Sequence, residues 1–171
     1  MNVLIGISYN IIINSQKAKM LMDELDLIIL NALQEDGRTP FTQIAKKAGV
    51  AESTIRSRYA GLVEQGILQT IAVIDPFAVG YNAPALIGVS VAPGAIHTVA
   101  EALEKLPEVT YLVLTLGGFD LMVEVFCRDR KHLTYLITEQ IQITPGVRAT
   151  ETLVIGKIYK LSFFWKPEIQ T

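Results

Sequence analysis

Cysteine and histidine are scarce in this chain, which has one cysteine and two histidines among 171 residues. The lone Cys127 excludes an intrachain disulfide, and a structural zinc site is disfavoured because Cys127, His97 and His132 are far apart in sequence. We therefore expect no metal site, and an intracellular protein that does not depend on disulfides for stability.

Charge is also sparse, at 19% of residues with a net charge of −2, whereas 50% of residues are hydrophobic. Because soluble domains average about 25% charged residues, the apolar excess predicts a surface buried between subunits. The apolar stretch "MNVLIGISYNIIINSQKAK" is too short to span a membrane and lacks the features of a signal peptide. We expect a cytoplasmic chain without a membrane partner. Residues 1–21 are expected to form a non-essential N-terminal extension, and three interpretations of it stay open: a disordered tail, an extra strand, or residues upstream of the true start.

Helical periodicity runs through residues 22–66. "DELDLIILNALQEDGR" has one apolar face, acidic residues in its first turn and Gly37 at its end. Thr39 is expected to cap a second helix with Pro40 at its first position, and a third helix is expected from Glu52 to Gly66. Three short helices with a tight glycine-containing link predict a helix-turn-helix domain. "ILQTIAVID", residues 67–75, is expected to form a strand and a wing within a linker, residues 67–84.

Basic residues concentrate on this domain although the whole chain is slightly acidic. Residues 37–63 carry five basic residues and one acid, for a local charge of +4, whereas residues 23–36 carry five acids and no base. A local basic patch is what phosphate binding requires. The alternative is a solvated helix with two unrelated arginines. The candidate contacts to double-stranded DNA are Thr39, Lys46, Lys47, Ser53, Thr54, Arg56, Ser57 and Arg58.

Residues 85–171 predict a second domain with the order β-α-β-β-α-β, which is the ferredoxin-like arrangement. The overall fold class is therefore α+β, with an N-terminal (winged) helix-turn-helix domain followed by this domain. Asp129 is expected to cap the second helix, and the last strand is expected over residues 147–161. Two helices cover only one face of four strands, yet the strands are apolar on both faces, so we expect a homodimer through the sheet.

The predicted hairpin "TLGGFDL" carries chemistry suited to a small zwitterion. Gly117 and Gly118 can adopt positive φ angles and leave N–H groups open to a carboxylate, and Asp120 can hold an ammonium group. The alternative is a plain glycine hairpin in which Asp120 bonds its own turn.

Taken together, five segments in this order resemble the leucine-responsive regulatory protein/AsnC (feast/famine) family over residues 22–160. They are "LDELDLIILNALQEDGR", "QIAKKAGVAESTIRSR", "GILQTIAVIDPFAVGY", "LPEVTYLVLTLGGFDLMVEV" and "TPGVRATETLVIG". The resemblance implies a DNA-binding transcription regulator that is not an enzyme and needs no cofactor. It also implies dimers that assemble further, to an octamer, with an effector, usually an amino acid, bound between dimers. The effector residues that it implies are Leu114, Thr115, Gly117, Gly118, Phe119, Asp120, Thr150, Thr152 and Val154.

This sequence departs from the family pattern near the third helix. Ala51 stands where the family usually has a capping residue, and Ala60 and Gly61 stand where relatives often carry basic residues. Arg58 matches the family's arginine, and Arg56 looks transposed with its neighbour. We expect Arg58→Ala to weaken DNA binding with little effect on the melting temperature.

Two alternatives to an effector-responsive regulator remain at the level of sequence. A siroheme-decarboxylase-like enzyme has the same architecture, but it would need a catalytic histidine, and His97 and His132 both fall on amphipathic helices where surface positions are expected. The other is a DNA-packaging protein that responds to no effector.

Overall fold

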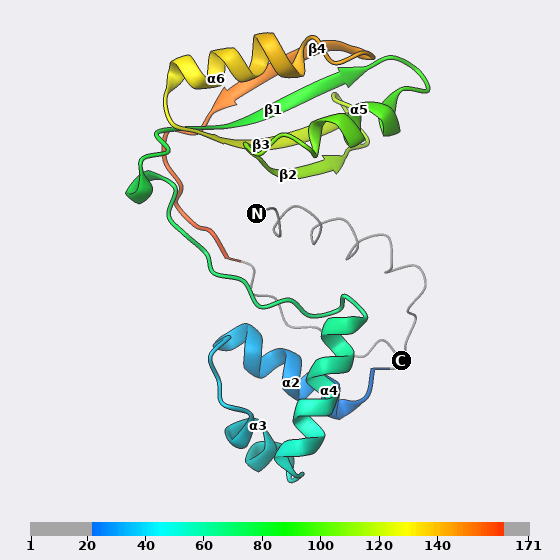
Figure 1. The fold of residues 1–171 in the computed structure, drawn as a ribbon, viewed down its shortest axis with the longest axis vertical. Helices are drawn as coiled ribbons and strands as arrows, with labels where there is room; N and C mark the ends of the chain where they lie inside the picture. The colour runs from blue at the N-terminus through cyan, green and yellow to red at the C-terminus, as the bar shows by residue number, and fades with distance from the viewer. Residues whose placement is uncertain (1–21, 163–171) are drawn as a thin grey trace. The chain divides into compact units, whose positions relative to one another are not determined.

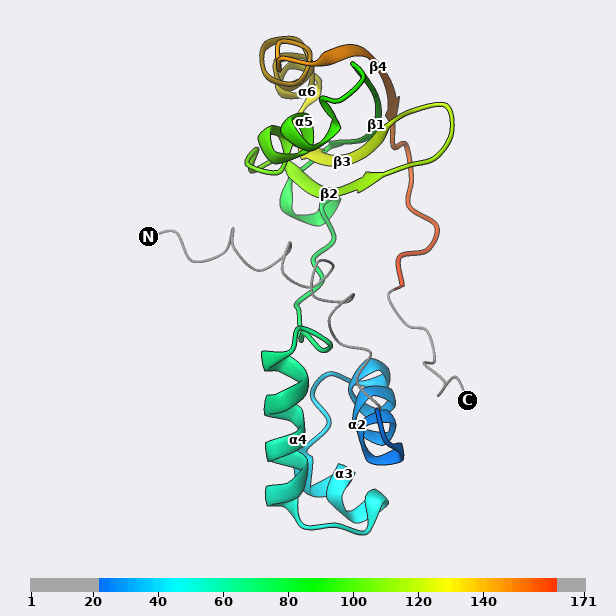
Figure 2. The same ribbon diagram turned by 90° about the vertical axis from the view of Figure 1, so that its right-hand side faces the viewer.

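The computed structural model describes residues 22–162, which divide into two compact units. Among the described residues, the first contains residues 22–72 and 160–162, and the second contains Val73–Tyr159 (Figures 1 and 2). The predicted extension, residues 1–21, lies outside the described residues.

Within the residues that the structure describes, the first unit is a three-helix domain. Its helices are α2 (Glu24–Glu35), α3 (Phe41–Ala48) and α4 (Glu52–Glu64). The apolar face of each contributes to one core, in which Ile29, Ile44, Ile55 and Leu62 are at most 1% exposed. The predicted helix-turn-helix is therefore confirmed, and its apolar periodicity is what buries the three helices against one another.

The ends of the helices differ in part from prediction. Asp23 caps α2 in a reciprocal capping box with Asp26, but Thr39 does not cap α3. Its hydroxyl instead donates to the carbonyl of Asp36 at 2.8 Å, and Pro40 occupies the N-cap position of α3. Because α3 begins at Phe41, Thr39 lies one residue before the N-cap, and its hydroxyl satisfies the end of α2 instead. Ala51 leaves α4 without a side-chain cap, as expected.

The predicted strand and wing at residues 67–75 are wrong for this chain. No strand is found there, because no other segment of residues 22–162 pairs with this one. A strand exists only where a neighbouring strand accepts and donates its backbone hydrogen bonds. The side chains of Ile71, Val73 and Ile74 remain 57–63% exposed.

The second unit is a four-stranded antiparallel sheet with helices on one face (Figures 1 and 2). After the short helix η2 (Phe77–Val79), its elements are β1 (Ala83–Val91), α5 (Ile96–Leu103), β2 (Val109–Leu114), β3 (Leu121–Cys127), α6 (Arg130–Leu136), η3 (Ile137–Ile141) and β4 (Val147–Val154). The strand order β2-β3-β1-β4 is that of the predicted ferredoxin-like fold, so the α+β fold class is confirmed. Asp129 caps α6 as expected, whereas β4 ends at Val154 rather than at residue 161.

The pattern of burial along the central strands marks the face of the sheet that the helices cover. Ala85, Ile87 and Val89 of β1, like every second residue of β3, are fully buried beneath α5 and α6. The residues between these buried positions point away from the helices. Tyr111 of β2 and Leu153 of β4 are in register with such residues of β3 and β1, and they are 55% and 56% exposed. The sheet therefore has one covered face and one largely apolar open face.

Cys127 ends β3 inside the core. Burial raises the pKa of its thiol to about 11, and the negative charges of Glu108 and Asp129 add to this effect. The thiol therefore stays protonated at neutral pH and has no nucleophilic character.

Candidate nucleic-acid interface and effector turn

The outer face of α4 carries small side chains, most of them with a hydroxyl group. Ser53, Thr54, Ser57 and Ala60 are all exposed along it. The link from α3 passes through Gly49, whose φ of 69° lies in the left-handed region that favours glycine, and this allows the tight turn between the two helices. A helix with short side chains on its outer face can approach the base edges in the major groove closely.

Lys46 and Lys47 supply cationic charge beside this helix. Both are exposed in the last turn of α3, and neither is in an ion pair with another of residues 22–162. Because their charge is not neutralised within the protein, they are well suited to contact phosphates.

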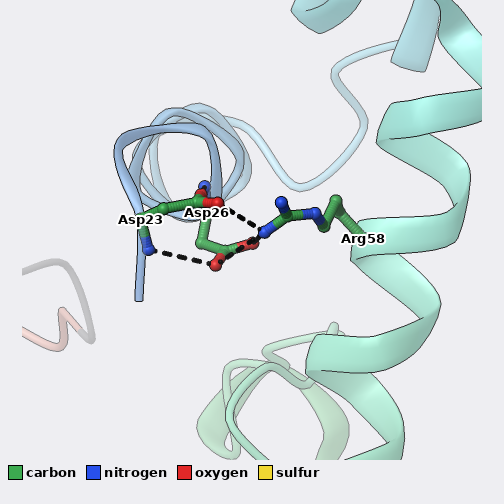
Figure 3. Close-up of polar contacts among 3 residues, drawn as sticks. All are labelled: Asp23, Asp26 and Arg58. Carbon is green, nitrogen blue, oxygen red and sulfur yellow. Dashed lines mark hydrogen bonds and ion pairs between the residues drawn. The ribbon is translucent and has the colours of Figure 1, made fainter. Parts of the chain in front are cut away.

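The two arginines of α4 have different partners. Arg58 points to the start of α2, where its Nη1 lies 2.7 Å from Oδ2 of Asp23 and 3.1 Å from Oδ1 of Asp26 (Figure 3). Asp26 has a side chain only 2% exposed, against 42% for Arg58. Arg58 thus neutralises a buried carboxylate and ties α4 to α2.

Arg56 points away from that ion pair. Its Nη2 lies 2.6 Å from Oε1 of Glu52, and its guanidinium carbon lies 5.4 Å from the ring centroid of Phe41 on α3. The side chain of Arg56 is nevertheless 66% exposed. Of the two arginines, Arg56 is therefore the one presented to solvent.

The structure exposes six of the eight residues predicted to contact DNA and leaves two half-buried. The exposed residues are Lys46, Lys47, Ser53, Thr54, Arg56 and Ser57. Thr39 and Arg58 are engaged in contacts within the protein. The expectation that alanine at position 58 would have little effect on the melting temperature is revised, because Arg58 is the cation that compensates Asp26.

Asp23 gives this ion pair a pH dependence. The backbone N–H of Asp26, followed by Arg58, lowers the pKa of Asp23 below its ordinary value of 3.8. Its contribution to stability is thus present above pH 3.8 and is lost as the pH falls through the lowered pKa. We expect this pKa, measured by NMR, to lie below 3.8 and to rise in Arg58→Ala. An unchanged pKa in that variant would contradict the pairing.

The turn between β2 and β3 is fastened at both ends. The N–H of Thr115 donates to the carbonyl of Asp120 at 3.0 Å, and the Thr115 hydroxyl donates to the carbonyl of Phe119 at 2.6 Å. The N–H of Asp120 donates to the carbonyl of Val89, and its Oδ2 accepts from the N–H of Val91 at 2.7 Å. The Asp120 carboxylate therefore bonds β1, and the alternative in which it bonds its own turn is wrong.

The prediction of positive φ angles at the two glycines of this turn is wrong. Neither Gly117 nor Gly118 has a φ in the left-handed region. The loop between β2 and β3 contains six residues, so the change of direction is spread over several of them. No atom lies within 4 Å of where a Cβ would stand at either position, so both glycines present open backbone to their surroundings.

Phe119 folds back from the turn onto β1. Its ring atoms lie 2.5–2.7 Å from where a Cβ of Gly88 would stand. Gly88 alternates with the buried Ile87 and Val89, so this contact is on the open face of the sheet. A glycine is required there by close approach of the ring and not by backbone conformation.

The β4 residues that the resemblance implies for the effector site do not lie on the same side of the sheet as Phe119. Thr150, Thr152 and Val154 pair with Val89, Ile87 and Ala85 of β1, so they share the helix-covered side of the sheet. Thr150 accepts a hydrogen bond from Nε2 of Gln142 at 2.8 Å. One chain thus places Phe119 and these β4 residues on opposite sides of the sheet, while Leu114 lies 58% exposed at the end of β2.

The sequence predicts a surface position for His132 and gives no sign of the contact that this residue makes. His97 is exposed as expected, but the side chain of His132 is only 19% exposed, with its Nε2 2.9 Å from Oε1 of Glu108. Its Nδ1 accepts from the N–H of Arg128 at 3.3 Å, so in the neutral ring Nε2 carries the hydrogen and donates to Glu108. The histidine joins α6 to the start of β2, and its position on the helix contained no signal of this pairing. In residues 22–162, no three side chains of the metal-binding types lie close enough to hold an ion.

The two units define a helix-turn-helix DNA-binding protein that carries a ferredoxin-like ligand-binding domain. Residues 22–63 match the AsnC-type helix-turn-helix domain, and residues 84–163 match the Lrp/AsnC ligand binding domain. The chain belongs to the Lrp/AsnC family of DNA-binding transcription regulators, which are not enzymes. No helix among residues 22–162 has the length and hydropathy to cross a membrane.

Relatives support this assignment over most of the chain. An uncharacterised HTH-type transcriptional regulator of Pyrococcus abyssi is 36% identical over 85% of this chain and 92% of its own. The structure of E. coli AsnC is similar with a TM-score of 0.76, 29% identity, and coverage of 86% of this chain and all of that one. A transcriptional regulator from Neisseria meningitidis, in its L-Met complex, has a TM-score of 0.73 with 25% identity, and the match covers 83% of this chain and 94% of that one.

Proposed function

We propose that an amino acid controls the DNA affinity or the assembly state of this regulator by binding at the turn between β2 and β3. The observation that carries the proposal is this turn, in which a carboxylate and open glycine backbone lie on a loop fastened to β1. The ligand-binding domain matched by residues 84–163, and the L-Met complex of the Neisseria regulator, support it.

The chemistry of the turn suits both ends of an amino acid. The backbone N–H groups of Gly117 and Gly118 can donate to its carboxylate. Asp120 uses Oδ2 for the N–H of Val91, which leaves Oδ1 to accept from an ammonium group. Leu114, Thr115 and Phe119 flank these groups. No cofactor other than the effector is required.

The proposal also includes a second subunit of the same chain. The open face of the sheet, with Tyr111 and Leu153 more than half exposed, would be buried in a homodimer, and dimers would assemble further to an octamer. Because Thr150, Thr152 and Val154 do not share a face with Phe119 in one chain, they would complete the pocket only from a neighbouring subunit. An effector at such a contact can shift the assembly through its differential affinity for two arrangements.

Thermal melting against each of the twenty amino acids tests the proposal. A ligand at one hundred times its dissociation constant stabilises by about 2.7 kcal/mol, which is about 5–10 °C for a chain of this size. We expect a shift of this size with one or two amino acids.

The matched variants are Asp120→Asn and Asp129→Asn. Asparagine at 120 keeps an oxygen for the N–H of Val91 but loses the charge that an ammonium group requires, so the shift should disappear. At 129 it still caps α6, and the shift should remain. No shift with any amino acid, or an undiminished shift in Asp120→Asn, would refute the proposal.

A further inference from the structure

Arg56 is held by two neighbours while most of its surface remains open. Glu52, one turn earlier on α4, accepts from Nη2 at 2.6 Å, and the ring of Phe41 lies 5.4 Å from the guanidinium carbon. An arginine fixed in this way loses less conformational freedom when it forms further hydrogen bonds. As the fifth residue of α4, it lies in the part of a recognition helix that meets base edges.

The guanidinium retains donors that the protein does not use. A guanidinium has five N–H groups, and within residues 22–162 the only hydrogen bond from Arg56 is the one to Glu52. Two parallel N–H groups match the O6 and N7 acceptors of guanine, which is the commonest specific contact in the major groove.

Glu52 favours a base over a phosphate as the partner. The carboxylate cancels the charge of Arg56 and would repel a phosphate brought to the same place, whereas the guanine edge is neutral and accepts hydrogen bonds. Lys46 and Lys47 have no such acid and are the better phosphate contacts. The small residues Ser53, Ser57 and Ala60 leave room beside Arg56 for the floor of the groove.

We infer that Arg56 reads a guanine in each half-site of the DNA, with Glu52 and Phe41 holding its guanidinium in position. The inference rests on DNA binding through α4 and, for its two half-sites, on the proposed homodimer, and it is independent of the amino-acid effector. Glu52 and Phe41 act as positioning residues, and Arg58, which is bound to α2, does not contact bases.

Selection from a library of randomised DNA duplexes tests the inference, using the full chain and its Arg56→Ala and Lys47→Ala variants. The wild type should enrich sites with a fixed guanine in each half-site. Arg56→Ala should lose the preference at that position alone, and Lys47→Ala should keep it. In the wild-type site, 7-deazaguanine at that position should lower affinity about tenfold, and it should have little effect on Arg56→Ala.

Salt dependence separates a base contact from a phosphate contact. The slope of log K against log salt should be unchanged in Arg56→Ala and should become shallower by about 0.9 per bound subunit in Lys47→Ala, because that variant removes one phosphate contact from each subunit. Glu52→Gln should weaken the guanine preference without abolishing binding. Base preferences in Arg56→Ala identical to those of the wild type, or a reduced salt slope in that variant, would overturn the inference. If the wild type enriches no sequence at all, sequence-specific regulation itself is overturned together with the inference. If the wild type enriches a site but its base preferences do not depend on Arg56, only the inference is overturned.

Discussion

Replacing Arg58 by alanine is expected to lower the melting temperature of the three-helix domain by about 5 °C or more. The side chain of Asp26 is 2% exposed, and Arg58 is the cation beside it. Without Arg58 the carboxylate remains buried, and its one partner among residues 22–162 is the N–H of Asp23, at 3.3 Å. An uncompensated buried charge is one of the few causes of large destabilisation by a single substitution.

Arg56→Ala is the matched control for this prediction. It removes the same side chain from the same helix, but the pair that it breaks is exposed, and exposed pairs contribute little. The melting temperature of Arg56→Ala should therefore stay within about 2 °C of the wild type. In addition, Asp26→Asn should lower the melting temperature less in the Arg58→Ala background than in the wild type. In that background the substitution removes a buried carboxylate that has lost its cation, whereas in the wild type it breaks the ion pair. Equal melting temperatures for the two arginine variants would contradict the role given to Arg58.

Gly88→Ala is expected to destabilise the sheet domain by about 1–3 kcal/mol, which is typical of overpacking. A methyl group at this position would stand 2.5 Å from the ring of Phe119, so the ring and the turn that carries it must move. Urea denaturation of the variant should show a lower midpoint with an unchanged slope. Because Phe119 belongs to the proposed effector turn, the melting shift produced by the effector should also shrink.

The double variant isolates the contact. In a Phe119→Ala background the ring is absent, and Gly88→Ala should be close to neutral. Gly88→Ser provides a second small substitution and should behave in the same way. If Gly88→Ala costs the same with and without the Phe119 ring, the contact between them does not explain the requirement for glycine.

Local patterns were sufficient to predict most of the fold. The apolar face of α2, the break at Gly49 and the order of strands and helices in residues 83–154 each follow from short-range periodicity and turn residues. The strand predicted at residues 67–75 failed for a physical reason. Its residues favour extended structure, but a strand also needs a partner, and periodicity does not supply one.

The site was less predictable because its contacts join distant parts of the chain. Arg56 and Arg58 look alike in sequence, and only the approach of α2, 32 residues away, distinguishes the arginine that pairs with Asp26. Likewise, Asp120 bonds Val91 across 29 residues, and Phe119 covers Gly88. Thr39 shows the same limit at short range, since α3 begins one residue later than predicted and the threonine hydroxyl bonds the end of α2.

The central claim is that an amino acid bound at the β2–β3 turn changes how this regulator engages DNA. The most direct test measures affinity and oligomeric state on a DNA site enriched by the wild type, with and without the amino acid that shifts the melting temperature. We predict a change in DNA affinity of about 5–150-fold, or a change in assembly state, and neither in Asp120→Asn. An amino acid that binds the protein but leaves both DNA affinity and assembly unchanged would contradict the account.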